Sequence, residues 1–261
     1  MGIGELLLLN AAVALGAMLL LWLASLAVRD VSIVDAWWGP GFALLAWVDV
    51  AAAGAHPRSL LLAAAATLWG VRLGGYLLWR NHGQPEDARY AAMRRHHGAR
   101  FPLVSLLTVF ALQGGLQVAV GLPFAVVAAE PGPGRLGALD AIGAALFAAG
   151  LAFESVADLQ LARFKADPRS AGRVMDRGLW AWTRHPNYFG DCLAWWGIFV
   201  VAVAAPFGWA SLPGPALMTF LLLRVSGVAL LERSIGKRRP GYAEYAARVP
   251  AFFPRPPRRV P

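Results

Sequence analysis

Charged residues are scarce in this chain of 261 residues, at 15% of the sequence against 58% hydrophobic residues. A soluble domain of this size carries about 25% charged and about 45–50% apolar residues. The mean hydropathy is +0.53, and the apolar residues gather in runs of roughly 20, a length that crosses a hydrocarbon core of about 30 Å. The composition therefore excludes an ordinary soluble domain and predicts an integral membrane protein.

Cysteine is almost absent as well. Cys192 is the single cysteine, which excludes a disulfide within the chain. The five histidines and this cysteine form no cluster with the spacing of metal ligands. We therefore expect neither a disulfide framework nor a metal site.

The long apolar runs predict the architecture. In lipid a helix satisfies its own backbone polar groups, so each run is expected to be a helix. The runs cover residues 3–28, 37–54, 59–79, 101–128, 138–160, 187–205 and 211–232. We expect one all-α membrane domain over residues 1–261, a bundle of seven transmembrane helices, with 254–261 as a disordered tail.

The basic residues indicate an orientation. Of the 24 Lys and Arg residues, 20 lie after the first, third, fifth and seventh runs, whereas only Arg58 and Arg135 lie after the second and fourth. Loops rich in Lys and Arg stay in the cytoplasm. We expect the N-terminus outside, the C-terminus in the cytoplasm, and a multi-pass protein of a bacterial inner membrane.

Polar residues inside the runs are paired at helical spacing. Residues four or eight apart share one face of a helix. The pairs are Arg72 with Tyr76, Gln113 with Gln117, Glu154 with Asp158, Asn187 with Asp191, and Arg224 with Glu232. Such pairs either join helices through buried hydrogen bonds or line a functional cavity. Five pairs on five helices favour a shared polar cavity that opens to the cytoplasm.

Asp35 precedes Trp37 and Trp38 at the start of the second run. Two interpretations stay open for this carboxylate. It caps the helix by accepting hydrogen bonds from free N–H groups, or it lies at the edge of the cavity beside indole rings that wall an apolar substrate.

The segment 178–191 carries a family resemblance. It contains the run Arg184-His-Pro-Asn-Tyr-Phe-Gly-Asp191 at the entry to a predicted membrane helix, and this run resembles the membrane steroid 5α-reductase family. Matching features elsewhere are Asp158 with Arg163-Phe-Lys165, the ending Arg238-Arg-Pro-Gly-Tyr242-x-x-Tyr245, Asp35-x-Trp-Trp-Gly, Trp69-Gly-Val-Arg72 and Leu116-Gln117.

The resemblance implies a seven-helix enzyme that binds NADPH at its cytoplasmic end and a steroid or other flat apolar enone lipid inside the bundle. The positions that match cofactor contacts are Arg72, Asp158, Lys165, Asn187, Tyr188, Asp191 and Arg224. Arginine suits the phosphates of NADPH because its planar fork donates two bonds at once. Trp37, Trp38, Trp69 and Gln117 are the candidate substrate contacts.

A Glu–Tyr pair serves the substrate carbonyl in the animal reductases that this chain resembles. Asp35 matches the glutamate, whereas the tyrosine position falls on Trp69, which has no proton to transfer. Tyr76, about two turns along the same helix, is the expected substitute. The alternative is a protonated Asp35 that donates directly.

Two other functions stay open. The R-H-P-x-Y pattern also occurs in membrane methyltransferases that use S-adenosylmethionine, of the isoprenylcysteine carboxyl type. Paired polar residues also suit a lipid-binding or transport protein.

The partners we expect are the lipid substrate and membrane lipid, with no nucleic acid, and the protein is expected to be a monomer.

Overall fold

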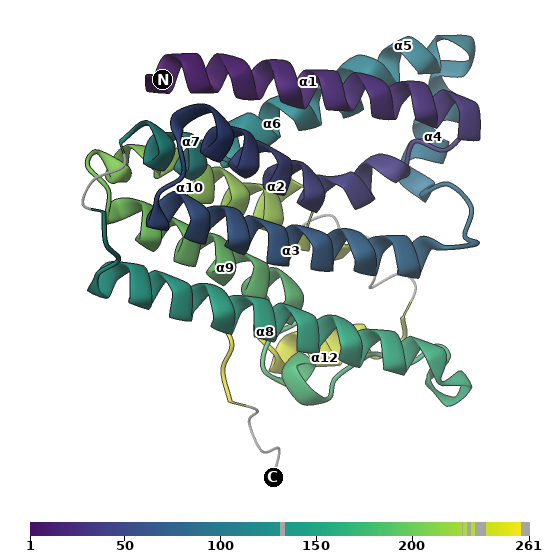
Figure 1. Cartoon of the computed structure of the whole chain (residues 1–261). Coiled ribbons are helices and arrows are strands. Elements are labelled where there is room, and N and C mark those ends of the chain that lie inside the picture. The colour runs from purple at the N-terminus through teal and green to yellow at the C-terminus, as the bar shows by residue number, and fades with distance from the viewer. Residues whose placement is uncertain (131–133, 226, 229–230, 233–238, 257–261) are drawn as a thin grey trace. The chain divides into compact units, whose positions relative to one another are not determined.

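The computed structural model describes residues 1–130, 134–225, 227–228, 231–232 and 239–256. These residues are mostly helical and include no β-strand (Figure 1). They form two compact units. The first unit is Met1–Asp140 with Val201–Gly214, and the second is Ala141–Val200 with Pro215–Pro261. The all-helical part of the prediction is therefore confirmed for the described chain.

The first unit is built on three long helices followed by a bent one. Its elements are α1 (Ile3–Val28), α2 (Ile33–Ala53), α3 (Pro57–Asn81), α4 (Ala88–His97), η1 (Gly98–Arg100), α5 (Phe101–Ser105), the π-helical η2 (Leu106–Ala111), α6 (Leu112–Val120), α7 (Leu122–Ala129) and the short η5 (Gly208–Ser211). The chain is helical without a gap from Ala88 to Val120. Gly121 ends this stretch, and Pro123 lies in the first turn of α7, where a missing N–H is tolerated.

Glycines bring α2 and α3 into backbone contact, and the two helices run side by side (Figure 1). A Cβ atom on Gly39 would lie 2.6 Å from the carbonyl oxygen of Gly70, and one on Gly74 would lie 2.7 Å from that of Ala36. No larger side chain fits at such distances. Small residues that allow this approach are typical of helix pairs in membranes.

The second unit begins with the long helix α8 (Ala138–Ala166), whose first turn belongs to the first unit. The remaining elements are η3 (Pro168–Ser170), η4 (Gly178–Ala181), α9 (Pro186–Val203), α10 (Pro213–Phe220), the π-helical η6 (Leu221–Val225) and α12 (Tyr242–Arg248). The last residues of α9, from Val201, and the first two of α10 belong to the first unit.

The packing of α8 against α9 also depends on glycine. A Cβ atom on Gly190 would lie 2.7 Å from the carbonyl oxygen of Gly150, and one on Gly197 would lie 2.7 Å from that of Gly143. The two helix backbones therefore touch at two levels. This contact brings the polar residues on the facing turns of α8 and α9 within reach of one another.

Four helical stretches are long and apolar enough to cross a membrane: Ile3–Val28, Pro57–Asn81, Ala88–Val120 and Ala138–Ala166. They coincide with the runs expected at 3–28, 59–79, 101–128 and 138–160, and they indicate a membrane protein. The runs at 37–54 and 187–205 are helical in α2 and α9, but Trp, Pro and Asp residues lower their apolar content. The seven-helix count and the orientation stay predictions.

The seventh run, 211–232, is helical in α10 and η6, and residues 226 and 229–230 within it lie outside the described chain. Of the expected tail at 254–261, only residues 254–256 are described. Arg238 of the quoted ending motif also lies outside the described residues.

Candidate functional site

In the first unit, Asp35 is the centre of a polar group at the start of α2. Tyr90 donates its hydroxyl proton to Oδ1 of Asp35 at 2.7 Å, and Nη2 of Arg89 donates to Oδ2 at 2.7 Å. The N-cap of α2 is Ser32. The cap interpretation of Asp35 is therefore wrong, because the carboxylate bonds to side chains of α4 instead.

The loop before α4 holds Arg89 and Tyr90 in place. Asp87 caps α4 and accepts hydrogen bonds from the backbone N–H of Arg89 at 2.9 Å and from its Nε at 2.8 Å. Glu86 accepts from the backbone N–H of Val31 at 3.0 Å and from two nitrogens of Arg94 at 2.9 and 2.7 Å. The hydrogen bonds of Arg94 hold the pKa of Glu86 below its usual value. These contacts tie the loop to the turn that leads into α2.

Tyr90 has an apolar environment. Its side chain is 6% exposed and belongs to a buried cluster of Met18, Val31, Val34, Tyr90, Phe101, Val109 and Phe110. Trp37 packs against this cluster. The indole Nε1 of Trp37 is buried and has no hydrogen-bond partner in the part of the chain that the structure describes. Buried hydrogen-bond donors nearly always have an acceptor, so this indole N–H is a candidate for binding a ligand.

Three of the candidate substrate residues meet in the core of the first unit. Trp38 and Trp69 both pack edge-to-face on Phe42, with ring centroids 5.1 and 5.8 Å apart. Gln117 is buried and donates from Nε2 to the carbonyl oxygen of Trp38 at 3.0 Å. The structure therefore brings Trp38, Trp69 and Gln117 together.

Arg72 and Tyr76 contact each other on α3 as their spacing predicted. The guanidinium of Arg72 lies 5.6 Å from the centre of the Tyr76 ring, and that of Arg80 lies 5.8 Å from it. The tyrosine hydrogen-bonded to Asp35 is Tyr90. Sequence reasoning missed Tyr90 because it looked for the tyrosine on the third predicted span, whereas Tyr90 is in the polar loop after it.

In the second unit, the contact of α8 with α9 joins two of the predicted cofactor residues. Nδ2 of Asn187 donates to Oδ1 of Asp158 at 3.1 Å. Asp158 and Asp191 are both buried. Tyr188 stacks on the ring of His185, with centroids 5.7 Å apart and planes 15° apart. The spacing rule paired residues along each helix, and this hydrogen bond of Asn187 crosses from α9 to α8.

The remaining cofactor candidates are more widely distributed. Lys165 is exposed in the last turn of α8, and Arg224 lies in η6. Arg72 belongs to the first unit, whereas the other six candidates belong to the second. Each unit thus groups its own share of the predicted site.

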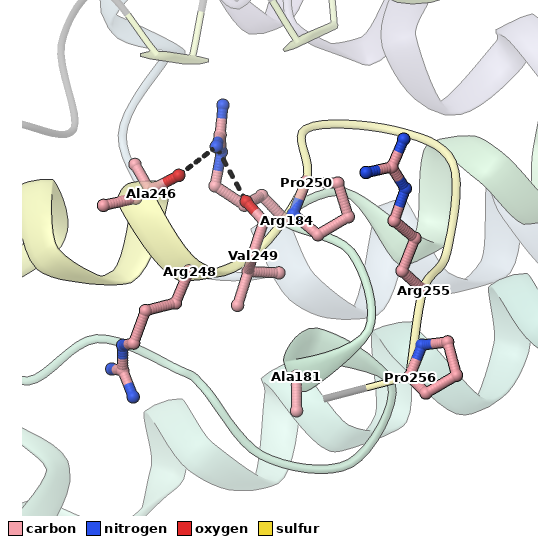
Figure 2. A pocket seen from close by; sticks show the side chains of 9 residues that line it. Ala181, Arg184, Ala246, Arg248, Val249, Pro250, Arg255 and Pro256 are labelled. Atoms are coloured by element: carbon pink, nitrogen blue, oxygen red, sulfur yellow. Dashed lines mark hydrogen bonds between the residues drawn. The ribbon is translucent and has the colours of Figure 1, made fainter. Parts of the chain in front are cut away.

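Arg184, the first residue of the R-H-P-N-Y run, holds the C-terminal segment of the second unit. Its guanidinium donates to Glu232 at 2.8 Å. It also donates to the carbonyl oxygens of Ala246 and Val249 at 2.9 and 2.8 Å (Figure 2). Its backbone N–H donates to the carbonyl oxygen of Pro250 at 2.9 Å. The last carbonyls of α12 therefore meet a cation, as the helix dipole favours.

His185 and two tyrosines complete this arrangement. Nε2 of His185 lies 3.1 Å from Glu232, and the hydroxyl of Tyr242 lies 3.4 Å from the same oxygen. Burial lowers the pKa of His185, and the bond with Glu232 opposes that shift. Tyr245 donates to the carbonyl oxygen of Trp180 at 2.6 Å. The R-H-P and Y-x-x-Y patterns mark these residues in the sequence, but the patterns do not predict their contacts with one another.

A shallow pocket opens beside Arg184 (Figure 2). Its lining residues are Ala181, Arg184, Ala246, Ala247, Arg248, Val249, Pro250, Arg255 and Pro256. Arg248 and Arg255 add positive charge to its wall, which suits an anion. None of the predicted site residues lines this pocket.

Comparison with known proteins gives a family but no activity. An uncharacterized protein of Schizosaccharomyces pombe is 26% identical over 235 residues, and the match covers 77% of this chain and 64% of that protein. This chain therefore spans less than two thirds of the length of the curated relative that it matches. No solved structure matches the chain. The family model described as protein of unknown function (DUF1295) matches residues 21–249, and the chain therefore belongs to the DUF1295 family.

Proposed function

We propose that this protein is a membrane-embedded, NADPH-dependent reductase of carbon–carbon double bonds conjugated to a ketone, with 3-oxo-Δ4 steroids or similar flat lipids as substrates. The observation that carries the proposal is the Tyr90–Asp35 hydrogen bond of 2.7 Å beside an apolar cluster. Two further points support it: the R-H-P-N-Y-x-G-D run, and membership of a family that includes steroid 5α-reductase-like membrane proteins.

The chemistry needs a proton donor in an apolar place. NADPH, when bound, supplies hydride to the β-carbon of the enone. Negative charge then develops on the carbonyl oxygen, and a positioned donor stabilises it most strongly where water is excluded. The Tyr90 hydroxyl provides such a donor, because the rest of its side chain is buried among apolar residues.

The Tyr90 hydroxyl has a single proton, which Asp35 accepts in the absence of substrate. To serve a ketone, the hydroxyl turns from Asp35 to the carbonyl oxygen and transfers its proton there. Asp35, in its protonated form, then returns a proton to Tyr90. The Asp35 side chain is 20% exposed and the Arg89 side chain 43% exposed, so Asp35 exchanges protons with water more readily than Tyr90 does.

Trp37 supplies a second donor. Its Nε1 is buried and has no partner among the described residues, and the ring packs against the cluster that contains Tyr90. A ketone oxygen that enters this cluster would satisfy the indole. Trp37 donates without transferring a proton and thus orients the carbonyl for Tyr90.

The residues of the second unit suit a dinucleotide phosphate. An amide and a carboxylate 3.1 Å apart, Asn187 and Asp158, match the hydrogen-bonding needs of a carboxamide or a ribose. The exposed side chains that follow along α8 and its loop supply cations for phosphate: Arg163, Lys165, Arg169, Arg173 and Arg177. Tyr188, Asp191 and Arg224 complete the proposed cofactor set of the second unit.

The proposal keeps the predicted membrane arrangement. It consists of seven helices, an external N-terminus and a cytoplasmic C-terminus in a bacterial inner membrane, with NADPH reached from the cytoplasm. The asymmetry of 20 basic residues against 2 supports this orientation.

The test compares two tyrosines. Purified protein in detergent receives NADPH and progesterone or testosterone, and NADPH oxidation and product mass are followed. We expect a product heavier by two hydrogens. Tyr90→Phe should lower kcat by about 10²–10⁴-fold, the usual contribution of a general acid, and Asp35→Asn should lower it as well. Tyr76→Phe is the matched control and should retain activity.

Loss of activity in Tyr76→Phe with full activity in Tyr90→Phe would reverse the assignment of the proton donor. NADPH binding, measured separately, tests the cofactor site, and Asn187→Ala should weaken it. Binding of S-adenosylmethionine in place of NADPH would overturn the reductase proposal in favour of a methyltransferase.

A further inference from the structure

Helix α1 is apolar on all sides, yet only one of its faces is turned inward. The buried residues Leu6, Asn10, Ala14 and Met18 follow one another at a spacing of four, which is one face of a helix. Leucines on other faces, such as Leu8 and Leu20, are exposed. Hydrophobicity alone does not choose among faces that are all apolar, so another interaction must set the rotation of α1.

Asn10 is the polar residue on this inward face. Its Nδ2 donates to Oδ1 of Asp49 on α2 at 3.0 Å and to Oδ2 at 3.1 Å. Both residues are almost fully buried, at 3% and 1% exposure. Near this contact, Leu6 packs with Ala125 and Ala128 of α7. A carboxyl group thus lies in an apolar environment with an amide as its partner.

An ionised Asp49 leaves this pair incomplete. Oδ1 of Asn10 is buried and accepts no hydrogen bond from any residue that the structure describes. A carboxylate has only acceptors and offers Oδ1 nothing. A neutral carboxylic acid has an O–H group that completes a two-bond ring with the amide, so that every polar atom is satisfied. It also removes the cost of a buried unpaired charge.

The charged groups on the neighbouring elements are engaged elsewhere. On α2, Asp35 bonds to Arg89 and Tyr90, and on α1 Glu5 accepts from the N–H of Gly2. On α3, Arg58 pairs with Asp140, while Arg72 and Arg80 lie over Tyr76. Helices α6 and α7 and segment η2 contain no ionisable residue. No described cation compensates a charge on Asp49.

We propose that Asp49 is a proton-binding site within the membrane part of the first unit. Its neutral carboxylic acid closes a two-bond pair with Asn10 and fixes the rotation of α1 against α2. The same face of α1 carries Met18 into the apolar cluster of Tyr90. The bound proton therefore also fixes one wall around that tyrosine.

The experiment uses two buried aspartates of the same unit. Asp49 has an amide partner, whereas Asp140 forms bonds of 2.7 and 3.0 Å with Arg58. Infrared difference spectra of purified full-length protein at neutral pH compare the wild type with Asp49→Asn and with Asp140→Asn. We expect the Asp49→Asn difference to contain the C=O stretch of a protonated acid. The Asp140→Asn difference should contain carboxylate bands.

A melting curve against pH gives an independent readout. The melting temperature of the wild type should fall by several degrees as the pH rises from about 4, where the unfolded carboxyl ionises, to the pH at which Asp49 of the folded protein loses its proton. Asp49→Asn should lack that fall. Carboxylate bands in the Asp49→Asn difference, or equal falls in both proteins over that pH range, would overturn the proposal. Neither readout uses NADPH or substrate, so the result is independent of the proposed function.

Discussion

Each unit of the molecule contains a carboxylate shared by an arginine and a tyrosine. In the first unit Asp35 accepts from Arg89 and Tyr90. In the second, Glu232 accepts from Arg184 and, at 3.4 Å, from Tyr242. The Arg89 side chain is 43% exposed, whereas that of Arg184 is 12% exposed and also bonds to two backbone carbonyls.

The difference shows how one combination of side chains serves two purposes. Arg184 is surrounded by acceptors that belong to the C-terminal segment, so its contacts stabilise the fold. The Arg89 side chain lies where water reaches it, and Asp35 accepts a hydrogen bond of 2.7 Å from the buried phenol of Tyr90. The Asp35 arrangement joins a buried hydroxyl donor to its carboxylate by the shorter bond, and for this reason we propose that the chemistry takes place there.

The largest effect is expected from Arg184. Arg184→Gln leaves Glu232 without its cation and frees the carbonyls of Ala246 and Val249. Each part-buried carbonyl left without its donor costs up to about 1–3 kcal/mol, whereas Glu232, whose side chain is 29% exposed, remains hydrated. Arg89→Gln is the matched variant and should cost no more than about 1 kcal/mol, because its pair is exposed. Thermal unfolding in detergent measures both, and equal losses would contradict the comparison.

A smaller effect is expected from the two tyrosines of α12. Tyr245 donates at 2.6 Å to a buried carbonyl, whereas Tyr242 lies 3.4 Å from Glu232. Tyr245→Phe should destabilise the protein by about 1–3 kcal/mol, since it leaves the carbonyl of Trp180 unpaired. Tyr242→Phe should cost less than half as much. A larger loss in Tyr242→Phe than in Tyr245→Phe would contradict this order.

The smallest effect concerns acid. Hydrogen bonds from Arg94 hold the pKa of Glu86 below its usual value of 4.5. A lowered pKa in the folded state gives stability that is present above 4.5 and is lost as the pH falls through the folded value. The loop that carries Arg89 and Tyr90 should therefore loosen in acid. Glu86→Gln should be less stable at neutral pH and show less further loss in acid. Parallel acid profiles of the two proteins would contradict this.

The sequence predicted the helices better than the contacts between them. Apolar runs of membrane length predicted the four helices that are long and apolar enough to cross a membrane, because lipid demands that pattern of any helix that crosses it. The shorter α2 and α9 were expected to span the membrane too. Trp, Pro and Asp residues lower the apolar content of both helices. The spacing of residues along one helix does not predict which other helix packs against it.

The site residues illustrate this limit. The i,i+4 rule placed Asn187 beside Asp191 on α9, and the structure adds its bond to Asp158 on α8. Tyr90 was missed because its partner Asp35 lies 55 residues earlier, and nothing in a local pattern joins them. Arg184 and His185 were recognised as part of a motif, but their contacts with residues 232–250 depend on the tertiary fold.

The glycine contacts of α8 and α9 offer a way to sort relatives without any assay. Gly143 and Gly150 are seven residues apart, as are Gly190 and Gly197, and the two sets face each other backbone to backbone. A chain that keeps both G-x6-G spacings around the R-H-P-N-Y run should hold an amide and a carboxylate as close as Asn187 and Asp158. A chain with a larger residue at position 150, 190 or 197 should not, because a Cβ atom there meets the backbone of the facing helix. The spacing thus becomes a search pattern for proteins that share this polar pair, whatever their substrates are.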